Sequence, residues 1–404
     1  MKLMQILALS SALALVQSAA MADDKVVKIG VLTDMSSLYA DIGGPNAVLA
    51  TQMAIEDSGL KDKGWTIDVI SADHQNKPDV GASITRQWYD VDHVDMVIDT
   101  PNSGVALAVS QVVKDKNGIF ISSGAATSEL TNKQCTPNTI HWTYDTYELA
   151  TGTGGAITKA GGDSWFFVTA DYAFGKTLES DTSAVVTANN GKILGSVRHP
   201  LNNSDFSSFL LQAQASKAKV VGLANAGADT ANSIKQAHEF GLTDGGQQLA
   251  ALLLFITDVH ALGLDVAQGL TFTNSFYWDM NDSTRAWSMK YQARSKGHSM
   301  PAMTQAGVYA GTLHYLKALE AMGGNAHDGA KIVAKMKEMP TDDPLFGKGT
   351  IRADGRKMHP AYLMQVKKPS ESKGEWDVYK LLATIPAEQA FRPLDKSDCP
   401  LVKK

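Results

Sequence analysis

Small hydroxyl and amide side chains gather in short loops that follow apolar segments. GIFISS runs straight into GAATSEL, and the earlier segment VDMVIDT runs into PNSG. The residues concerned are Asn102, Ser103, Ser123, Gly124, Ala125 and Thr127. Free N–H groups at a helix start attract negative charge, and small side chains let an anion approach the backbone. We therefore expect these loops to form an anion cradle, although each Ser, Thr or Asn could equally cap a helix.

Aromatic residues near the other loops could supply flat apolar walls for the same site. They are Tyr39, Trp142, Tyr144, Tyr147, Tyr172, Phe276, Tyr277 and Trp278. Core packing is the expected role of Trp142 and Phe276. The segment NAGADT adds Asn225 as a further polar candidate.

Signatures of catalysis, cofactors and metals are missing from the sequence. GTGG at 152–155 lacks the third glycine of a dinucleotide loop and lies in a helical pattern. His238-Glu239 begins like a zinc motif, but position 242 is Leu, and the ten histidines lack ligand spacing. We expect no cofactor and no metal. An exported enzyme is the weaker hypothesis, because it requires a nucleophile or metal set that no motif supplies.

Short β-rich runs alternate with amphipathic helices along the chain, which predicts parallel sheets covered on both faces. The first series has strands at 26–35, 66–73, 94–100 and 118–123, and helices at 46–59, 78–92 and 104–117. The second has strands at 164–170, 192–200, 218–226 and 248–255, and helices at 173–190, 205–217 and 228–241, with Ser204 as an N-cap. Late helices at 283–297 and 304–323 precede a β-rich tail with turns at Asp354-Gly355 and Lys373-Gly374. The sequence thus predicts an α/β fold of two doubly wound lobes, with ligands beyond the carboxyl ends of the strands.

The composition limits the possible partners, and the N-terminal segment indicates the cellular compartment. The 404 residues carry a net charge of -5 without charged blocks, which argues against nucleic acid as a partner. Lys2, the apolar run 3–16 and Ala20-Met21-Ala22 form a secretory signal at 1–22, with cleavage after Ala22; the run is too short for a membrane anchor. Cys135 and Cys399 are the two cysteines, and in an oxidising space they most simply form a disulfide, with two free thiols as the alternative.

Taken together, the segments resemble the type I periplasmic solute-binding proteins of ABC importers, in the leucine/isoleucine/valine-binding cluster. The resemblance rests on VVKIGVLTDMSSLYADIGGPNAVLATQMAIED, DTPNSGVALAV, ISSGAATSELT, DYAFG, NSDFSSFL and GKGTIRADGR, in order along the mature chain. It implies a three-segment hinge between lobe one (26–142 and 276–342) and lobe two (145–273 and 350–404). It also implies that Asn102, Ser103, Ser123, Ala125 and Thr127 hold a ligand carboxylate, on which Tyr172 closes.

One departure bears on the ligand. Amino-acid-binding relatives carry an acidic residue in the loop after the strand at 248–255, where this sequence has Phe255 and Ile256, and Asp258 follows two or three residues later. A buried ammonium without a carboxylate partner is costly. The resemblance therefore favours an aromatic carboxylate, such as a benzoate- or hydroxycinnamate-like lignin product. Branched-chain or other hydrophobic amino acids, or small amides, remain the alternative if Asp258 is the partner.

The expected partners are a small organic acid and an inner-membrane ABC permease, and the expected protein is a periplasmic monomer. A receptor's sensing domain is a third hypothesis. It would require a transmembrane helix and a signalling region after the tail, and the sequence pattern predicts neither.

Overall fold

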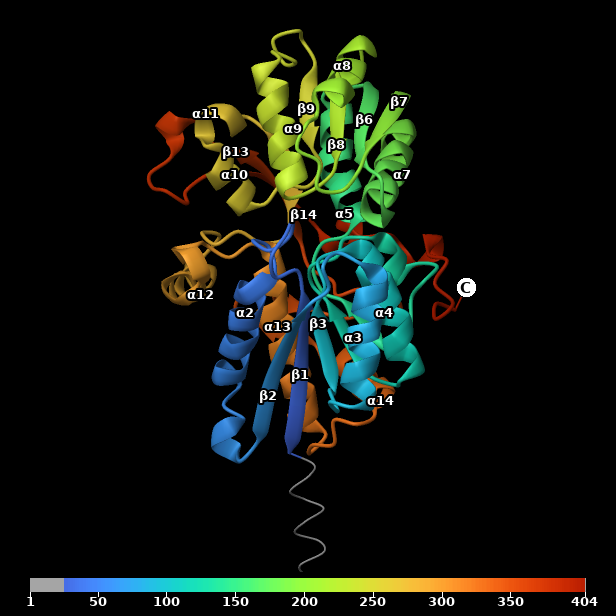
Figure 1. The fold of residues 1–404 in the computed structure, drawn as a ribbon, viewed down its shortest axis with the longest axis vertical. Helices are drawn as coiled ribbons and strands as arrows, with labels where there is room; N and C mark the ends of the chain where they lie inside the picture. The colour runs from blue at the N-terminus through green and yellow to red at the C-terminus, as the bar shows by residue number, and fades with distance from the viewer. Residues whose placement is uncertain (1–24, 404) are drawn as a thin grey trace, which may run out of the picture.

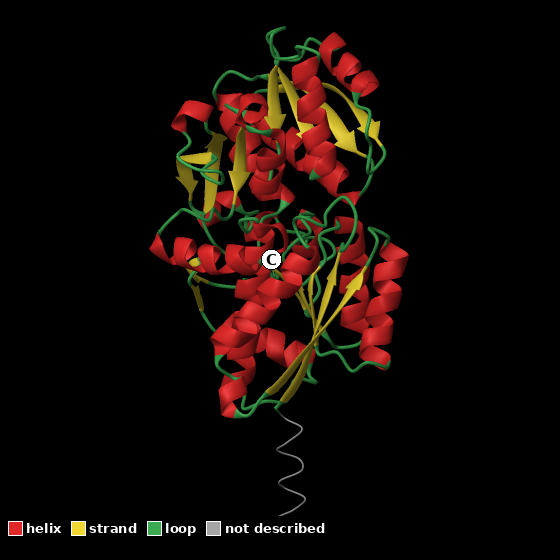
Figure 2. Cartoon of the chain, turned by 60° about the vertical axis from the view of Figure 1, so that its left-hand side comes forward, coloured by secondary structure: helices red, strands yellow, loops and turns green. Residues whose placement is uncertain are grey.

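The computed structural model describes residues 25–403, so the predicted signal peptide at 1–22 lies outside the described residues. Two lobes are stacked along the long axis, and each contains its own parallel sheet (Figures 1 and 2). We call the N-terminal sheet with its helices lobe one, and the elements around the second sheet lobe two. Within the described residues, no helix is long and apolar enough to span a membrane.

The sheet of lobe one has the order β2-β1-β3-β4-β5, and its strands are parallel. Its strands are β1 (Val26–Thr33), β2 (Thr66–Asp73), β3 (Met96–Asp99), β4 (Ile119–Ser122) and β5 (Thr139–His141). Its helices are α2 (Gly44–Ser58), α3 (Pro78–Asp90), α4 (Ser103–Asp115), α12 (Asp282–Arg294), α13 (Met303–Ala321) and α14 (Gly329–Glu338). The short pair β11 (Thr341–Asp343) and β12 (Gly347–Gly349) follows α14.

Both faces of this sheet are buried at its central strands β3 and β4, which explains why these two strands are almost continuously apolar. In β4, Ile119 and Ile121 join the large core cluster that includes α2 and α13, whereas Phe120 points to the other face. There it packs in a second cluster with Trp88 of α3 and Val109 of α4. Side chains alternate between faces along a strand, so only a strand that is covered twice needs apolar residues at every position.

The main sheet of lobe two is also parallel, in the order β7-β6-β8-β9. Its strands are β6 (Ser164–Ala170), β7 (Lys192–His199), β8 (Val220–Ala224) and β9 (Gln248–Ala251). The helices are α5 (Thr146–Leu149), α6 (Gly155–Lys159), α7 (Ala173–Ala188), α8 (Ser207–Ala215), α9 (Ala228–Glu239), α10 (Ile256–Leu262) and α11 (Leu264–Ala267). An antiparallel sheet of β10 (Thr271–Asn274), β13 (Ala361–Val366) and β14 (Tyr379–Ile385) completes the lobe, followed by α15 (Ala387–Ala390).

The predicted strands and helices match these elements, with a few local corrections. Ser204 is not the N-cap of α8: the helix begins at Ser207, whose N–H donates to the Asp205 carboxylate (2.9 Å). The strand predicted to reach 255 ends at Ala251. Asp354-Gly355 forms a tight turn closed by the Ile351–Lys357 bridge, but Lys373-Gly374 lies within a longer connection between β13 and β14. The helix α14 was not predicted.

The chain passes three times between the sheets of the two lobes. The first crossover follows β5, the second follows β10, and the third precedes β13. The predicted disulfide is confirmed: Cys135, in a loop of lobe one, is bonded to Cys399 in the C-terminal tail. The tail therefore returns to lobe one after β14 and α15, which belong to lobe two.

Candidate functional site

The carboxyl ends of the strands in lobe one lie at one level, because the register aligns them. Leu32 of β1 is level with Asp99 of β3, Asp99 is level with Ser122 of β4, and Ser122 is level with His141 of β5. The loops that follow these strands therefore meet at the edge of the sheet that faces lobe two (Figure 1). The sequence predicts an anion cradle in these loops, and the register shows that they share one edge of the sheet.

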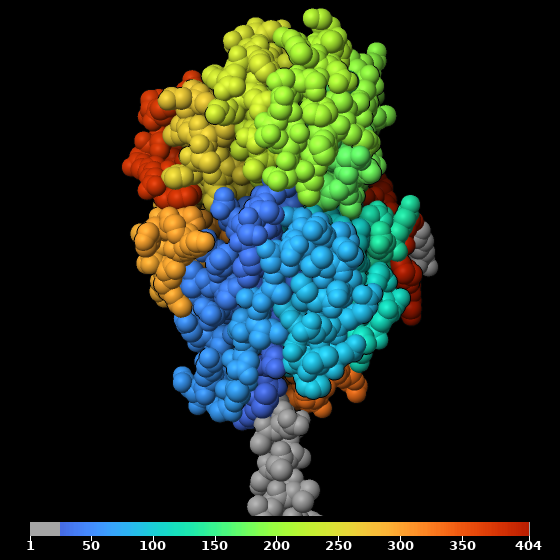
Figure 3. All heavy atoms as spheres, viewed as in Figure 1, coloured from blue at the N-terminus to red at the C-terminus, as the bar shows by residue number. Residues whose placement is uncertain are grey.

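Loops from both lobes enclose a small cavity at this level. It is lined by Tyr39, Ile42, Pro101, Ser103, Ala126 and Tyr144 from the side of lobe one and the first crossover, and by Tyr172, Phe174, Ala226 and Leu253 from lobe two. Its volume is about 10 Å³, which is about the space of one water molecule. On the outside of the molecule the two lobes touch each other (Figure 3).

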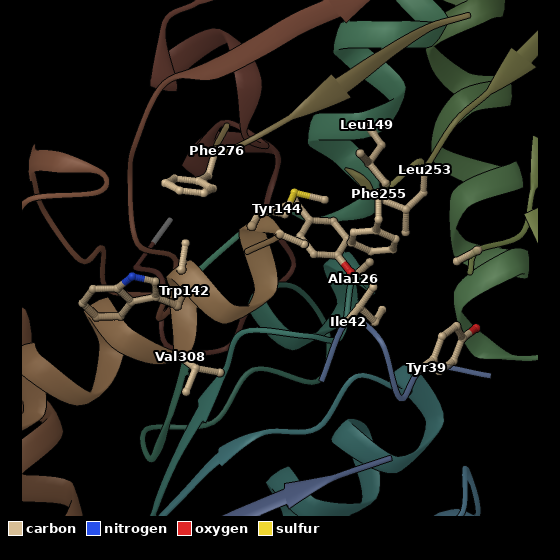
Figure 4. Packing of buried hydrophobic residues seen from close by; sticks show 14 of the residues in the cluster. Tyr39, Ile42, Ala126, Trp142, Tyr144, Leu149, Leu253, Phe255, Phe276 and Val308 are labelled. Carbon is tan, nitrogen blue, oxygen red and sulfur yellow. The ribbon is translucent and has the colours of Figure 1, made fainter. Parts of the chain in front are cut away.

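The two tyrosine hydroxyls of Tyr39 and Tyr172 are hydrogen-bonded to each other and so connect the lobes across the cavity. Tyr39 lies in the loop after β1, and Tyr172 immediately precedes α7. Burial raises the pKa of both hydroxyls above the ordinary tyrosine value, so both are neutral at physiological pH, and either one can donate to the other. Tyr144 lies against Phe255 with an edge-to-face ring contact (Figure 4), and its hydroxyl donates to the carbonyl of Gly124 (2.6 Å).

The predicted cradle residues lie close together, but their side chains are largely engaged within the protein. Asn102 caps α4 by accepting from the N–H of Val105 (3.1 Å), and the Ser103 hydroxyl accepts from the N–H of Thr127 (3.2 Å). The Ser123 hydroxyl donates to the Asp99 carboxyl group (3.3 Å). These bonds fix the two loops against each other, so the polar surface that remains for a ligand is chiefly backbone.

Two backbone amides of the 123–127 loop are without an acceptor among the described residues. The N–H groups of Ala125 and Ala126 have no protein acceptor in the described part of the chain, and Ala126 lines the cavity. Thr127 lies at the contact between the lobes, with its hydroxyl 3.3 Å from the Thr177 hydroxyl of α7. Free amides beside small side chains can donate hydrogen bonds to a carboxylate while the surrounding apolar walls exclude water.

Of the predicted site residues, only Tyr39, Ser103, Tyr144 and Tyr172 line this cavity. The rest of the cradle, which is Asn102, Ser123, Gly124, Ala125 and Thr127, lies beside the cavity, and four further predicted residues lie elsewhere. The Asn225 side chain is buried in lobe two, where it bonds with Ser233 (3.0 Å) and Thr230 (2.9 Å). Tyr147 lies under the Arg392 guanidinium, 4.8 Å from the ring centre.

Tyr277 and Trp278 both donate to the Trp376 carbonyl, at 3.1 and 2.9 Å, and so attach the second crossover to the loop between β13 and β14. Core packing is confirmed for the other two aromatics: Trp142 is fully buried, and Phe276 packs on Trp287 and Phe346.

Sequence reasoning missed the apolar part of the wall. Ile42, Pro101, Phe174, Ala226 and Leu253 line the cavity from several loops of the two lobes. Leu253 and Ala226 follow the ends of β9 and β8, so the rule that ligands bind beyond the strand ends pointed to their positions. Nothing in their local sequence distinguishes them from core residues.

A wider groove of about 470 Å³ lies between the loop that follows β1 (residues 36–42) and helices α9 and α10. Asp258 lines it and is only 8% exposed; one carboxylate oxygen accepts from the N–H of Phe255 (2.9 Å) at the start of α10. Burial raises the pKa of Asp258 to about 7. Among the described residues, no group of His, Cys, Asp and Glu side chains could hold a metal ion.

Comparison with known proteins identifies the family. The model of the family described as periplasmic binding protein matches residues 26–375. The chain belongs to the periplasmic binding protein family. Proteins of this family are non-enzymatic substrate-binding components of ABC transporters, work with a permease and are located in the periplasm.

Solved structures of other periplasmic binding proteins share the fold. One from Burkholderia mallei is 53% identical, with a TM-score of 0.90, over 94% of this chain and all of that chain. A branched-chain amino acid ABC transporter periplasmic ligand-binding protein from Burkholderia xenovorans LB400 is 41% identical, with a TM-score of 0.82, over 93% of this chain and all of that chain. A solute-binding protein from R. palustris in complex with benzoate has a TM-score of 0.79 over 90% of this chain and 97% of that chain, and its 21% identity shows a shared fold alone.

Proposed function

We propose that this protein captures a small carboxylate in the cavity between its lobes and delivers it to an inner-membrane permease. An aromatic acid of the benzoate or hydroxycinnamate type is the favoured ligand. The observation that carries this proposal is the pairing of free amides at Ala125 and Ala126 with walls made of aromatic and aliphatic side chains. The amides would hold the carboxylate, and the walls would enclose the ring.

A ligand of that size requires the lobes to separate before it enters. The present cavity holds about 10 Å³, and the Tyr39–Tyr172 contact crosses it. We propose that lobe one (26–142 and 276–342) and lobe two (145–273 and 350–404) move about the three crossovers, while the disulfide at Cys399 keeps the end of the tail on lobe one. A bound ligand then takes the place of the direct tyrosine contact. The mature protein is proposed to begin after Ala22 and to work as a monomer.

Branched-chain or other hydrophobic amino acids, or small amides, are the second candidate. Two observations favour the amino acids: the Burkholderia xenovorans structure carries the name of a branched-chain amino acid transporter component, and Asp258 lines the groove next to the cavity. A substrate ammonium at that carboxylate would offset the cost of burying it. The groove and the cavity share Ile42, so one ligand could reach both.

A thermal-shift screen separates the two candidates. Benzoates, cinnamates, branched-chain amino acids and amides are each added to the purified protein, with tryptophan fluorescence as a second readout. We expect aromatic acids to raise Tm and quench fluorescence, and leucine to do neither. Micromolar binding of leucine or isoleucine, with no aromatic acid bound, would show that the proposed ligand class is wrong.

Two variants then test the site itself. Ser123→Ala combined with Thr127→Ala removes two hydroxyls that order the cradle, and should weaken a carboxylate ligand. Trp278→Phe is the control, because Trp278 bonds to the Trp376 carbonyl and has no contact with the 123–127 loop among the hydrogen bonds described. Unchanged affinity in the first variant would contradict the cradle. If leucine binds, loss of leucine affinity in Asp258→Asn would identify the ammonium partner.

A further inference from the structure

The backbone is strained where β3 ends, directly behind the proposed carboxylate site. Asp99 has φ of +84° and Thr100 has φ of +61°, which places two consecutive non-glycine residues in the left-handed region. Such conformations cost about 1–3 kcal/mol each and persist only where surrounding contacts impose them. Here they turn the chain sharply from β3 into the PNSG loop.

Asp99 is the residue around which the three ligand-side loops are assembled. Its carbonyl accepts from the N–H groups of Ser123 and Gly124 at 3.4 and 3.5 Å, and one carboxyl oxygen accepts from the Ser123 hydroxyl (3.3 Å). Gly43, in the loop after β1, packs so closely that an added Cβ would lie 2.9 Å from the other carboxyl oxygen. A Cβ on Gly124 would lie 2.9 Å from the carboxyl oxygen that accepts from Ser123.

The Asp99 side chain is fully buried, and the hydroxyls beside its carboxyl group belong to Thr33 and Ser123; both lower its pKa, but less than burial raises it. The titratable groups that interact with it are Asp34 after β1, Tyr144 in the first crossover and Tyr291 on α12. None of these described groups is a cation. Burial, with a smaller contribution from Asp34, raises the pKa of Asp99 to about 7.

We propose that Asp99 is the positioning residue of the carboxylate site, and that it becomes protonated when an anionic ligand lies against the Ala125 and Ala126 amides. The proposal rests on the proposed function, because it requires an anion at this position. Two negative charges with little water between them repel strongly, and Asp99 has no counter-ion to offset the repulsion. Uptake of one proton removes the repulsion and leaves the hydrogen bond from Ser123 in place.

The proposal predicts proton-linked binding. If only the protonated form accepts the anion, a group that titrates near 7 makes Kd about tenfold weaker at pH 8 than at pH 6. Benzoate is a suitable probe, because it stays ionised throughout this range. Asp99→Asn keeps the shape of the side chain and removes the titration, so its Kd for benzoate should vary less than about twofold between the same pH values.

Isothermal titration calorimetry in buffers of different ionisation enthalpy measures both Kd and proton uptake. The wild type should take up close to one proton per benzoate near pH 8, and Asp99→Asn close to none. Glu148→Gln is the matched control, since Glu148 is another buried acid with a pKa raised to about 8 but is bonded to Ser275 in the second crossover. It should keep the wild-type slope. A flat wild-type profile, or an unchanged slope in Asp99→Asn, would overturn the proposal.

A measurement of stability without ligand tests the role of Asp99 separately from the identity of the ligand. The stability of Asp99→Asn relative to wild type should increase from pH 5 to pH 8, because only the wild type then carries a buried charge. No increase would overturn the proposal whatever the ligand. If benzoate fails to bind, the proposed ligand class is wrong, and the same pH series with L-leucine, whose carboxylate would meet the same amides, decides the role of Asp99.

Discussion

The Arg356 guanidinium lies 3.3 Å from the Asp145 carboxylate, and both side chains are buried where the first and third crossovers meet. Arg356 also donates to the Thr143 carbonyl and lies over the Phe391 ring at 4.4 Å. Nearby, Glu148 accepts from the Ser275 hydroxyl at 2.9 Å, which adds the second crossover to the network. All three connections between the lobes are therefore joined by one set of buried polar contacts.

Breaking this ion pair on one side should be more harmful than removing both charges. Arg356→Met leaves Asp145 buried without its partner, and we expect a loss of about 3–5 kcal/mol in unfolding free energy. Adding Asp145→Asn should recover part of the loss, since Asn can still cap α5 by accepting from the N–H of Glu148. Urea denaturation of both variants measures this, and equal stability of the single and double variants would contradict it.

The contact between Tyr39 and Tyr172 should favour the closed arrangement of the lobes. Removing either hydroxyl loses a hydrogen bond of about 1 kcal/mol, so Tyr39→Phe and Tyr172→Phe should each increase the radius of gyration of the ligand-free protein in small-angle X-ray scattering. The double variant should open no further than either single variant. Tyr315→Phe is the control, because its buried hydroxyl has no hydrogen-bond partner. Strictly additive opening in the double variant would argue against the contact.

The sequence predicted the parts of the site that depend on local pattern, and not those that depend on how the lobes meet. The loops at 102–103 and 123–127 were predictable because strands and small polar residues adjoin in the chain. Whether an aromatic residue faces the cavity depends on tertiary packing: Tyr144 and Tyr172 line it, whereas Tyr277 and Trp278 contact the loop at Trp376. Asp99 was not singled out, because its left-handed backbone and its burial leave no local signal.

The Cys135–Cys399 disulfide should stabilise the protein by constraining the unfolded chain. It joins residues 264 positions apart, and the chain-entropy model gives about 5.6 kcal/mol for a loop of this length. In the folded protein the N–H of Asp398 also donates to Asn132 (2.7 Å) and keeps the tail near its loop, so the native state of the reduced chain gains little freedom that would offset this effect. Thermal unfolding with and without reductant tests this. The variant with both cysteines changed to Ser should unfold at the reduced wild-type temperature, and should not respond to reductant.

Glu148 should make stability depend on pH. Burial, with the like charge of Asp145, raises its pKa to about 8 in the folded protein, against about 4.3 for an unperturbed Glu. The folded state therefore holds a proton that the unfolded state has lost between these values. The contribution of Glu148 to the unfolding free energy is full below about pH 4.3 and is lost as the pH rises towards 8, by at most about 1.4 kcal/mol per pH unit.

Glu148→Gln should thus gain stability relative to wild type from pH 5 to 8, whereas the exposed Asp282→Asn should not. Urea denaturation at several pH values measures this, and an equal pH dependence in wild type and Glu148→Gln would contradict it.

Gly124 should be intolerant of any side chain, because the two cradle loops approach each other there. An added Cβ would lie 2.7 Å from the Pro101 Cα and 2.9 Å from the Asp99 carboxyl, and the first of these atoms is backbone that cannot rotate away. Gly124→Ala must push the PNSG loop away from the 123–127 loop and misplace the Ala125 and Ala126 amides. We expect at least a tenfold loss of ligand affinity and a loss of about 1–3 kcal/mol in stability.

Gly374→Ala is the matched control, since its Cβ would meet nothing within 4 Å. Calorimetry and urea denaturation of the two variants measure both effects; wild-type affinity in Gly124→Ala would mean that the close approach of these loops is not needed to hold the ligand.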